Sequence, residues 1–169
     1  MLGRAPIVDF DGTLAALDVD WAGLRRTLGV ARILDLWSEP GGGRWAVVDD
    51  AELRAATSAH PVSPVIGHLG AADAFAVLTN NCERSVWRFL ERFDELAGRA
   101  RAVVGRETLQ GPKTDFTVFA RGFATCVEAT APERGPEDVV YVGDQDYELE
   151  FASRLGARSL HVLQLGAQR

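Results

Sequence analysis

The second half of this 169-residue chain alternates short apolar strands with amphipathic helices, and this alternation constrains the fold more than any other feature. Strands are predicted at Ala74–Leu78, Arg101–Val104, Asp138–Val142 and Arg158–Leu163. Helices are predicted between them at Glu83–Leu96, Asp115–Ala129 and Tyr147–Leu155. Strands that alternate with helices pair in parallel through right-handed crossovers. With a further apolar strand at Ala5–Val8, the sequence predicts an α/β fold: a Rossmann-like parallel sheet of about five strands with helices on both faces.

The segment between the first strand and this pattern is mainly helical in character. Helices are predicted at Asp20–Leu28, Ala31–Trp37 and Asp49–Ser58, and a short one opens at Pro61 and Pro64 and runs through Leu69. Asp20 is the expected N-cap of the first, and Asp49 or Asp50 of the third. Residues 38–44 are a predicted loop.

We therefore expect two structural parts. Residues 1–14 and 70–169 form the core domain, and residues 15–69 form a small helical cap inserted after the first strand. Trp21, Trp37 and Trp45 all lie in this insert, and we expect them to build a small core of its own.

Composition excludes several classes of function. The formal net charge of −6 and the pI near 5.1 argue against electrostatic binding to nucleic acid or to an anionic membrane. No apolar run approaches the length of a membrane span, and the N-terminus lacks the pattern of a signal peptide. Two cysteines, Cys82 and Cys126, are too few for a zinc site. We expect a cytoplasmic protein, monomeric or homodimeric.

The most informative motif follows the first strand and reads Asp9-Phe10-Asp11-Gly12-Thr13. Side chains two residues apart in a strand point the same way, so the two carboxylates leave the strand close together. Such a pair repels unless a cation lies between the carboxylates or they share a proton. Gly12 allows the chain to turn sharply after them. The motif indicates a site for chemistry rather than a simple acidic turn.

Polar residues follow the other strands at the same predicted edge of the sheet. They are Thr79-Asn80-Asn81, then Lys113, which is the only lysine in the chain, then Gly143-Asp144 with Asp146 and Glu148 after it. In parallel sheets ligands bind beyond the carboxyl ends of the strands. We expect these residues to meet in one site.

In these motifs the chain resembles the haloacid dehalogenase superfamily, and in particular its phosphoglycolate-phosphatase-like branch. The matching pattern is an apolar strand leading into Asp-x-Asp-Gly-Thr-Leu at 9–14, a strand ending in Thr79, Lys113 before a helix, and Gly143-Asp144 followed by Glu148. The resemblance covers residues 1–14 and about 70–165.

The resemblance implies a phosphomonoester hydrolase acting on a small phosphorylated metabolite. Asp9 would be the nucleophile that forms an aspartyl-phosphate, and Asp11 the general acid and base. Thr79, Asn80 and Lys113 would bind the phosphoryl group. Magnesium would be held by Asp9, Asp11 (through its backbone carbonyl) and Asp144, with Glu148 and Thr13 supporting the site.

The sequence departs from the family pattern in three ways. Glu148 replaces the usual aspartate, and Asp146 is an alternative acid at that motif. Pro112 precedes Lys113, whereas the family usually reads Lys-Pro. The cap is shorter than typical helical caps of this branch, which predicts a more open site. Two alternatives stay open: a phosphomutase or phosphotransferase of the same superfamily, and a catalytically silent binding protein with the same fold.

Overall fold

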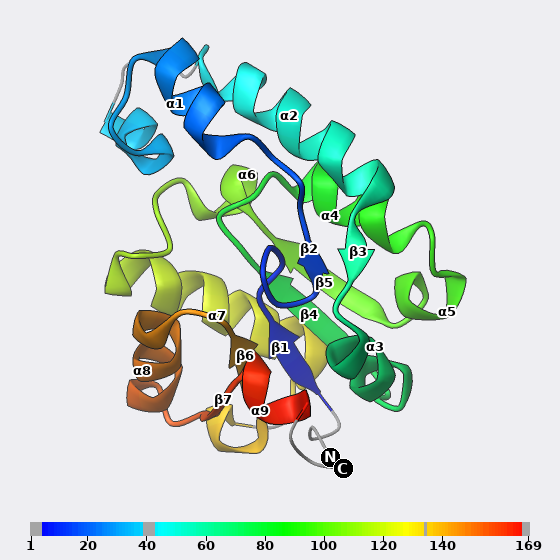
Figure 1. Cartoon of the computed structure of the whole chain (residues 1–169). Helices are drawn as coiled ribbons and strands as arrows, with labels where there is room; N and C mark the ends of the chain where they lie inside the picture. The colour runs from blue at the N-terminus through cyan, green and yellow to red at the C-terminus, as the bar shows by residue number, and fades with distance from the viewer. Residues whose placement is uncertain (1–4, 39–42, 134, 167–169) are drawn as a thin grey trace.

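A parallel five-stranded sheet forms the centre of the molecule, with its strands in the order β5-β4-β1-β6-β7 (Figure 1). The computed structural model describes residues 5–38, 43–133 and 135–166. The strands of this sheet are β1 (Pro6–Val8), β4 (Phe75–Leu78), β5 (Ala100–Val104), β6 (Val140–Gly143) and β7 (Arg158–His161). The predicted α/β class and the parallel sheet are confirmed.

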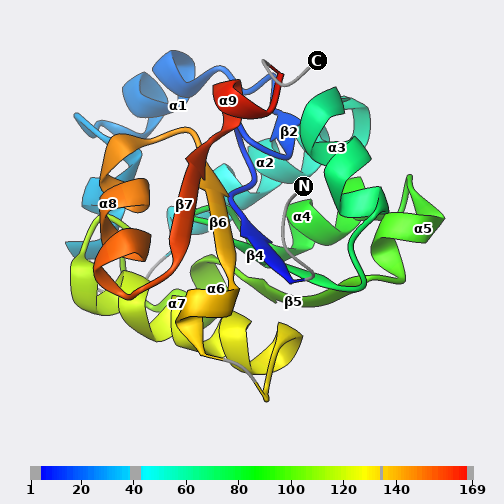
Figure 2. The same cartoon turned by 90° about the horizontal axis from the view of Figure 1, so that it is seen from below.

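Helices cover both faces of this sheet, as the view from below shows (Figure 2). The helices are α1 (Trp21–Leu28), α2 (Trp45–Ser58), α3 (Ser63–Gly70), α4 (Glu83–Leu90), α5 (Asp94–Ala97), α6 (Arg106–Leu109), α7 (Phe116–Thr130), α8 (Asp146–Arg154) and α9 (Val162–Gly166). Short 3-10 turns cover Ile33–Ser38 and Pro136–Asp138. No helix among the described residues is both long and apolar enough to cross a membrane.

Successive residues of each strand supply two different cores, because side chains alternate across a sheet. Val8, Val77 and Val142 pack under α3, α4 and α9, together with residues such as Phe89 and Leu165. The alternate strand residues, among them Ile7, Leu78 and Tyr141, pack under α7 and α8 with Phe119 and Phe123. Both faces of the sheet are therefore buried, which is why its strands are almost continuously apolar.

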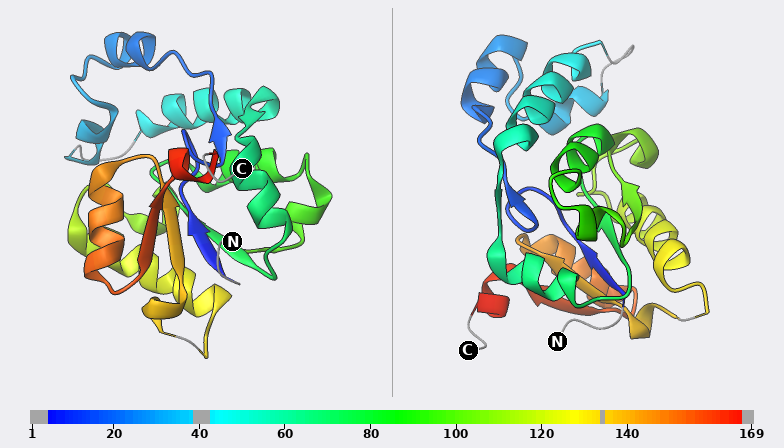
Figure 3. Two further views of the ribbon diagram at one scale, coloured as in Figure 1. Left: turned by 60° about the horizontal axis from the view of Figure 1, so that its bottom comes forward. Right: turned by 90° about the vertical axis from the view of Figure 1, so that its right-hand side faces the viewer.

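The inserted segment leaves and re-enters the core through a two-stranded ribbon. In it β2 (Ala15–Ala16) pairs antiparallel with β3 (His60–Pro61), and Ala15 lies opposite Pro61. Between these strands, α1 and the first half of α2 lie at one end of the molecule, beyond the sheet (Figure 3).

A small separate core holds this end of the insert together. Leu28, Leu36 and Val48 are its buried members, and Trp21 and Trp45 pack against them. Trp37 lies with its ring 5.1 Å from that of Trp45. The expected tryptophan-lined core of the insert is confirmed.

The later part of the insert belongs to the main core instead. Ala56 of α2 and Val65 and Leu69 of α3 are buried in the same cluster as Phe75 and Val77 of β4. The helix α2 packs against α4 (Figure 1).

Several predicted elements were wrong in detail. The helix predicted at 31–37 is a 3-10 helix at Ile33–Ser38, and the strand predicted at 158–163 ends at His161 and is followed by α9. The third helix of the insert begins at Trp45, not near Asp49, because Trp45 and Val48 provide apolar contacts that start it earlier. The helix predicted at 83–96 stops at Leu90, and a separate α5 follows. Between them Phe93 has an extended φ of −137°, and its ring centroid lies 5.2 Å from that of Phe89 in a tilted arrangement. In the predicted loop 38–44, residues 39–42 lie outside the described residues.

Candidate active site

A cavity of about 280 Å³ opens at the carboxyl ends of β1, β4 and β6. It is lined by Asp9, Asp11, Gly12, Thr79, Asn80, Asn81, Lys113, Asp144, Gln145, Tyr147 and Glu148. The structure therefore brings together every site residue predicted from the sequence except Thr13. Thr13 is buried beside the cavity, and its hydroxyl has no hydrogen-bond partner within the described part of the chain.

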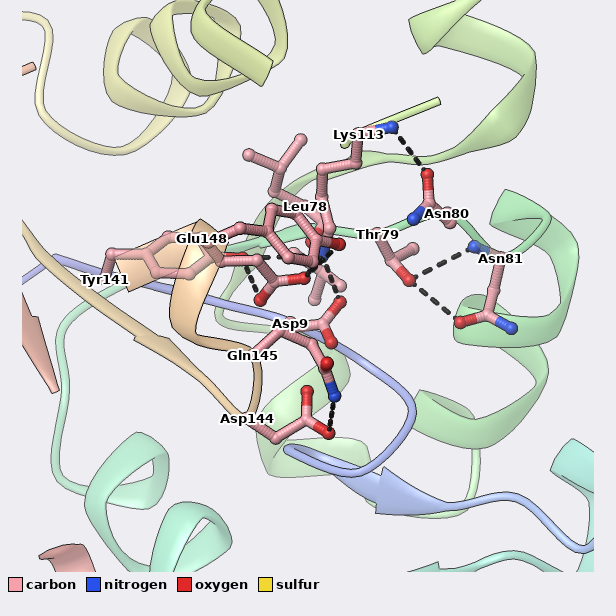
Figure 4. Close-up of polar contacts among 12 residues, drawn as sticks. Asp9, Leu78, Thr79, Asn80, Asn81, Lys113, Tyr141, Asp144, Gln145 and Glu148 are labelled. Atoms are coloured by element: carbon pink, nitrogen blue, oxygen red, sulfur yellow. Dashed lines mark hydrogen bonds and ion pairs between the residues drawn. The ribbon is translucent and has the colours of Figure 1, made fainter. Parts of the chain in front are cut away.

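Asp9 and Lys113 form a buried ion pair at the floor of this cavity (Figure 4). Lys113 Nζ donates to Asp9 Oδ1 at 2.6 Å and to the carbonyl of Leu78 at 3.0 Å. Burial raises the pKa of Asp9, and the positive charge of Lys113 opposes that rise. Burial also disfavours the Lys113 ammonium, but the Asp9 and Glu148 carboxylates outweigh it and raise the pKa of Lys113. The lysine is therefore charged at neutral pH.

Glu148 lies against the same lysine rather than free in the cavity. Its Oε1 is 2.7 Å from Lys113 Nζ and accepts from Tyr147 Oη at 3.1 Å. Its Oε2 accepts from Tyr141 Oη at 3.0 Å. Burial raises the pKa of Glu148 to about 7. Glu148 thus supports Lys113, which the sequence alone did not suggest.

Asp11 is a partly buried carboxyl that lines the cavity. Its Oδ1 accepts the backbone N–H of Leu17 at 2.9 Å, which fixes the carboxyl at the mouth of the cavity. Burial raises the pKa of Asp11 to about 6, with smaller contributions from the charges of Asp9, Asp144 and Glu52. A carboxyl group with this pKa is protonated about a tenth of the time at pH 7, far more often than an ordinary aspartate.

The residues after β4 form a loop on the opposite wall of the cavity (Figure 4). Thr79 Oγ1 donates to Asn81 Oδ1 at 2.9 Å and accepts from the Asn81 N–H at 3.2 Å. Asn80 Oδ1 accepts the backbone N–H of Lys113 at 2.7 Å, which ties this loop to the lysine. The loop immediately precedes α4, whose N-terminus favours an anion.

Asp144 completes the acidic side of the site. One oxygen each of Asp9, Asp144 and Glu148 lies within 4.8 Å of the others, and carboxylate oxygens are the ligands that magnesium prefers. Both Glu148 oxygens are engaged with Lys113 and the two tyrosines, which leaves Asp9 and Asp144 as the side chains suited to a metal. Asp146 is exposed at the start of α8 and lies outside this group of described acids.

Gly12 is the residue that lets the first motif approach Asp144. Its φ is +84°, and a Cβ at this position would lie 2.6 Å from Asp144 Oδ2. We expect Gly12→Ala to lower the free energy of unfolding by about 1–2 kcal/mol, measured by urea denaturation, and to weaken metal binding. Gly67→Ala in α3 is the control, because nothing lies within 4 Å of its Cβ position, and it should be neutral or stabilising. Equal stability of the Gly12 variant and wild type would contradict this account of the turn.

Two buried charged residues near the cavity, Glu52 and Arg106, were not predicted from the sequence. Arg106 is buried under the ring of Trp45, with its Cζ 4.2 Å from the ring centroid, and pairs with Glu52 and Asp49 of α2. The available signal was spacing: Glu52 lies on the apolar stripe of α2 with Val48 and Ala55, where a charged residue requires a partner.

A second group of possible metal ligands, Asp49, Glu52 and Cys82, lies in this same region. The two carboxylates are already paired with Arg106. Burial raises the pKa of Cys82 to about 12, so the thiol keeps its proton. This group is better explained as an ion-pair network than as a metal centre.

The fold is that of the haloacid dehalogenase superfamily, as the matching solved structures show. A candidate phosphoglycolate phosphatase from Lactobacillus plantarum matches with a TM-score of 0.69 at 12% identity, over 100% of this chain and 90% of that one. CbbY from Rhodobacter sphaeroides in complex with phosphate matches with a TM-score of 0.64 at 16% identity, over 95% and 86% of the two chains. L-2-haloacid dehalogenase from Xanthobacter autotrophicus matches with a TM-score of 0.59 at 18% identity, over 94% and 76%.

Comparisons at the sequence level gave no match: no protein-family model and no curated protein matches the chain. The resemblance stated from the motifs is thus supported by the fold. Because one fold serves several chemistries, the activity has to be argued from the site.

Proposed function

We propose that this protein is a magnesium-dependent phosphatase that hydrolyses a small phosphorylated metabolite through an aspartyl-phosphate intermediate. The observation that carries the proposal is the placement of Asp9, Asp11, Lys113 and Asp144 around one cavity at the carboxyl ends of the strands. A nucleophile, a general acid, a buried cation and a metal ligand are the groups that phosphoryl transfer requires.

In the first step Asp9 attacks phosphorus. Lys113 holds Oδ1, so Oδ2 is the oxygen available for attack. The new O–P bond forms as the bond from phosphorus to the ester oxygen breaks, and Asp11 gives its proton to the departing alcohol. Lys113, whose charge is secured by Asp9 and Glu148, balances the negative charge of the phosphoryl group.

In the second step Asp11, now ionised, takes a proton from water. The resulting hydroxide equivalent attacks the phosphorus, and the bond between phosphorus and Asp9 breaks to release inorganic phosphate. The loop from Thr79 to Asn81 would hold the phosphoryl oxygens throughout, with the amide of Asn80 contributing. Stabilisation of the transferring group by fixed donors accounts for most of the rate enhancement in such reactions.

Asp9 and Asp144 would hold the magnesium ion, with the backbone carbonyl of Asp11 as a further ligand and Glu148 and Thr13 as support. The carboxylate grouping and the space that Gly12 leaves beside Asp144 fit an oxygen-ligand cation. When bound, magnesium neutralises phosphate charge and helps to align the phosphoryl group for in-line attack.

We further propose that residues 15–69 act as a reduced cap over a core made of residues 1–14 and 70–169, in a cytoplasmic monomer or homodimer. A small lid covers less of the leaving group than a full one. The substrate would then be a small metabolite whose alcohol portion extends from the cavity, such as a sugar phosphate.

The test is a panel of phosphomonoesters, from phosphoglycolate through sugar phosphates to nucleoside monophosphates, assayed by phosphate release with magnesium present. Hydrolysis of at least one ester is expected. Transfer of the phosphoryl group to a second sugar hydroxyl instead of water would identify a phosphotransferase. No turnover of any ester, with phosphate still bound, would support the silent binding protein.

Removing the metal is expected to stop hydrolysis. Exhaustive chelation should lower the rate by about 100-fold or more, and magnesium should restore it better than calcium, because calcium takes more ligands at longer distances. Asp144→Asn should raise the magnesium concentration needed for half-maximal activity, while Asp146→Asn at its exposed position should leave it unchanged. Undiminished turnover after chelation, or equal effects of the two substitutions, would contradict the metal assignment.

A further inference from the structure

The buried carboxylate of Glu52 lies far from the motifs in sequence but next to the cavity loop in space. Glu52 comes from α2 of the insert and is 1% exposed. A buried carboxylate is strongly destabilising unless hydrogen-bond donors surround it. The structure supplies three such donors, and all three belong to the core.

Two of these donors lie in the loop that follows β4. Asn81 Nδ2 donates to Glu52 Oε1 at 3.0 Å, and the backbone N–H of Cys82 donates to Oε2 at 2.8 Å. The third donor is Arg106, whose Nη2 donates to Glu52 Oε1 at 2.6 Å. The insert therefore makes hydrogen bonds directly to the loop after β4.

This contact determines the orientation of the Asn81 amide. An amide presents a donor on one side and an acceptor on the other. With Nδ2 directed at Glu52, Oδ1 must face Thr79, and it accepts the Thr79 hydroxyl proton at 2.9 Å. Both Thr79 and Asn81 line the cavity, so Glu52 fixes which polar atoms the loop presents there.

We propose that Glu52 is a positioning residue for phosphate binding: through Asn81 and the Cys82 amide, the inserted helix holds the loop after β4 in the conformation that receives a phosphoryl group. This inference rests on the proposed function. When phosphate binds, a phosphoryl oxygen would accept the hydrogen bond of the Thr79 hydroxyl in place of Asn81 Oδ1. The hydrogen bond from Asn81 Nδ2 to Glu52 would meanwhile hold the asparagine in position. Glu52 itself touches neither substrate nor the reacting atoms.

Asp49 provides the matched control on the same helix. It lies one turn before Glu52 and pairs with the same Arg106 and with Arg84, at 3.8 Å from the latter. In contrast to Glu52, it has no hydrogen bond to the loop among the described residues. Asp49→Asn therefore weakens docking of the helix on the core. Glu52→Gln in addition replaces one of the two oxygens that accept from Asn81 and Cys82 with an amide group, which can only donate.

The experiment measures binding of inorganic phosphate by titration calorimetry to magnesium-loaded wild type, Glu52→Gln and Asp49→Asn, together with kcat and KM on the ester that the panel identifies. For Glu52→Gln we expect the phosphate Kd and the KM to rise about tenfold, with a smaller change in kcat. For Asp49→Asn the phosphate Kd and the KM should stay within about twofold of the wild-type values. This should hold even if its melting temperature falls by as much as that of Glu52→Gln.

If Glu52→Gln does not fold, a second variant tests whether the contact between Glu52 and Asn81 controls phosphate binding. Asn81→Ala leaves Glu52 paired with Arg106 and the Cys82 amide, and it should raise the phosphate Kd in the same way. Where both variants fold, the effects of Glu52→Gln and Asn81→Ala on the phosphate Kd should be clearly less than additive, because Asn81 carries one of the two contacts through which Glu52 acts on the loop and only the contact with the Cys82 amide is left.

Equal changes in Glu52→Gln and Asp49→Asn, additive effects in the double variant, or an unchanged phosphate Kd in Asn81→Ala would each overturn the inference. Failure of the proposed function has a different signature: wild type would hydrolyse no ester, while the phosphate titrations could still be compared between variants.

Discussion

Asp9→Asn is expected to abolish ester hydrolysis, lowering kcat by about 10³-fold or more, as removal of a nucleophile does in other covalent mechanisms. The amide is nearly the same size as the carboxylate but cannot attack phosphorus. It still offers an oxygen to Lys113, which keeps Glu148 as its charged partner at 2.7 Å. The fold should therefore survive, and circular dichroism should match that of wild type.

The control for this variant is Asp73→Asn, an exposed position in the turn before β4 that lies outside the cavity lining. It should retain full activity. The wild-type protein with magnesium, a beryllium salt and fluoride should also trap a beryllofluoride adduct on Asp9, and the asparagine variant should not. Retention of a tenth of the wild-type rate by Asp9→Asn, on any confirmed substrate, would refute the covalent mechanism.

Lys113→Met should have the largest effect on stability. Lys113 is 1% exposed and is the cation between the buried carboxylates of Asp9 and Glu148. Removing one partner from a buried charged group typically costs about 3–5 kcal/mol, because the remaining charges lie uncompensated. We expect a loss of this size in urea denaturation at pH 8, together with loss of activity.

The pH dependence of this loss follows from the two acids left behind. Without the ammonium, burial raises their folded-state pKa values further above the unfolded ones; that of Glu148 is about 7 even with Lys113 present. A raised acid pKa means that stability is present at low pH and is lost as the pH rises through the folded value. The difference in unfolding free energy between wild type and variant should therefore narrow from about pH 8 to about pH 5.

Tyr141→Phe is the control for Lys113→Met. It removes a hydroxyl that bonds to Glu148 at 3.0 Å and lies 3.4 Å from Lys113, but it removes no charge. Its cost should be about 1–2 kcal/mol. If the difference in unfolding free energy between wild type and Lys113→Met does not change with pH, uncompensated carboxylates are not the cause of the lost stability.

The sheet and the catalytic candidates could be predicted because their signals are local. A strand followed by polar residues is visible in the sequence, and parallel pairing brings the ends of such strands to one edge. Asp9, Thr79, Lys113 and Asp144 meet at the cavity for that reason. Asp20 was likewise predictable as an N-cap, and its carboxylate accepts the N–H of Gly23 at 2.7 Å.

The contacts of Glu148 and Glu52 could not be predicted because they depend on the packing of distant elements. Glu148 turns toward Lys113 since Tyr141 and Tyr147 hold it there, and no pattern around residue 148 encodes this. Glu52 faces Asn81 across 29 positions of sequence. Even the start of α2 was set by Trp45 packing in the small core of the insert, which outweighed the capping preference of Asp49.

The pairing of β2 with β3 determines where insertions and deletions disturb the sheet least. Ala15 and Pro61 are partners in that ribbon, so the chain between them is a loop whose ends are already closed. The entropy of closing a flexible loop grows only logarithmically with its length, and doubling the length costs about 0.6 kcal/mol. Because Ala56 and Ala59 of this segment are buried in the main core, the tolerance applies to the part of the segment before α2, where residues can be added or deleted at little cost to the sheet. Changes of length there leave β1, and with it the carboxylates of Asp9 and Asp11, in register with β4 and β6.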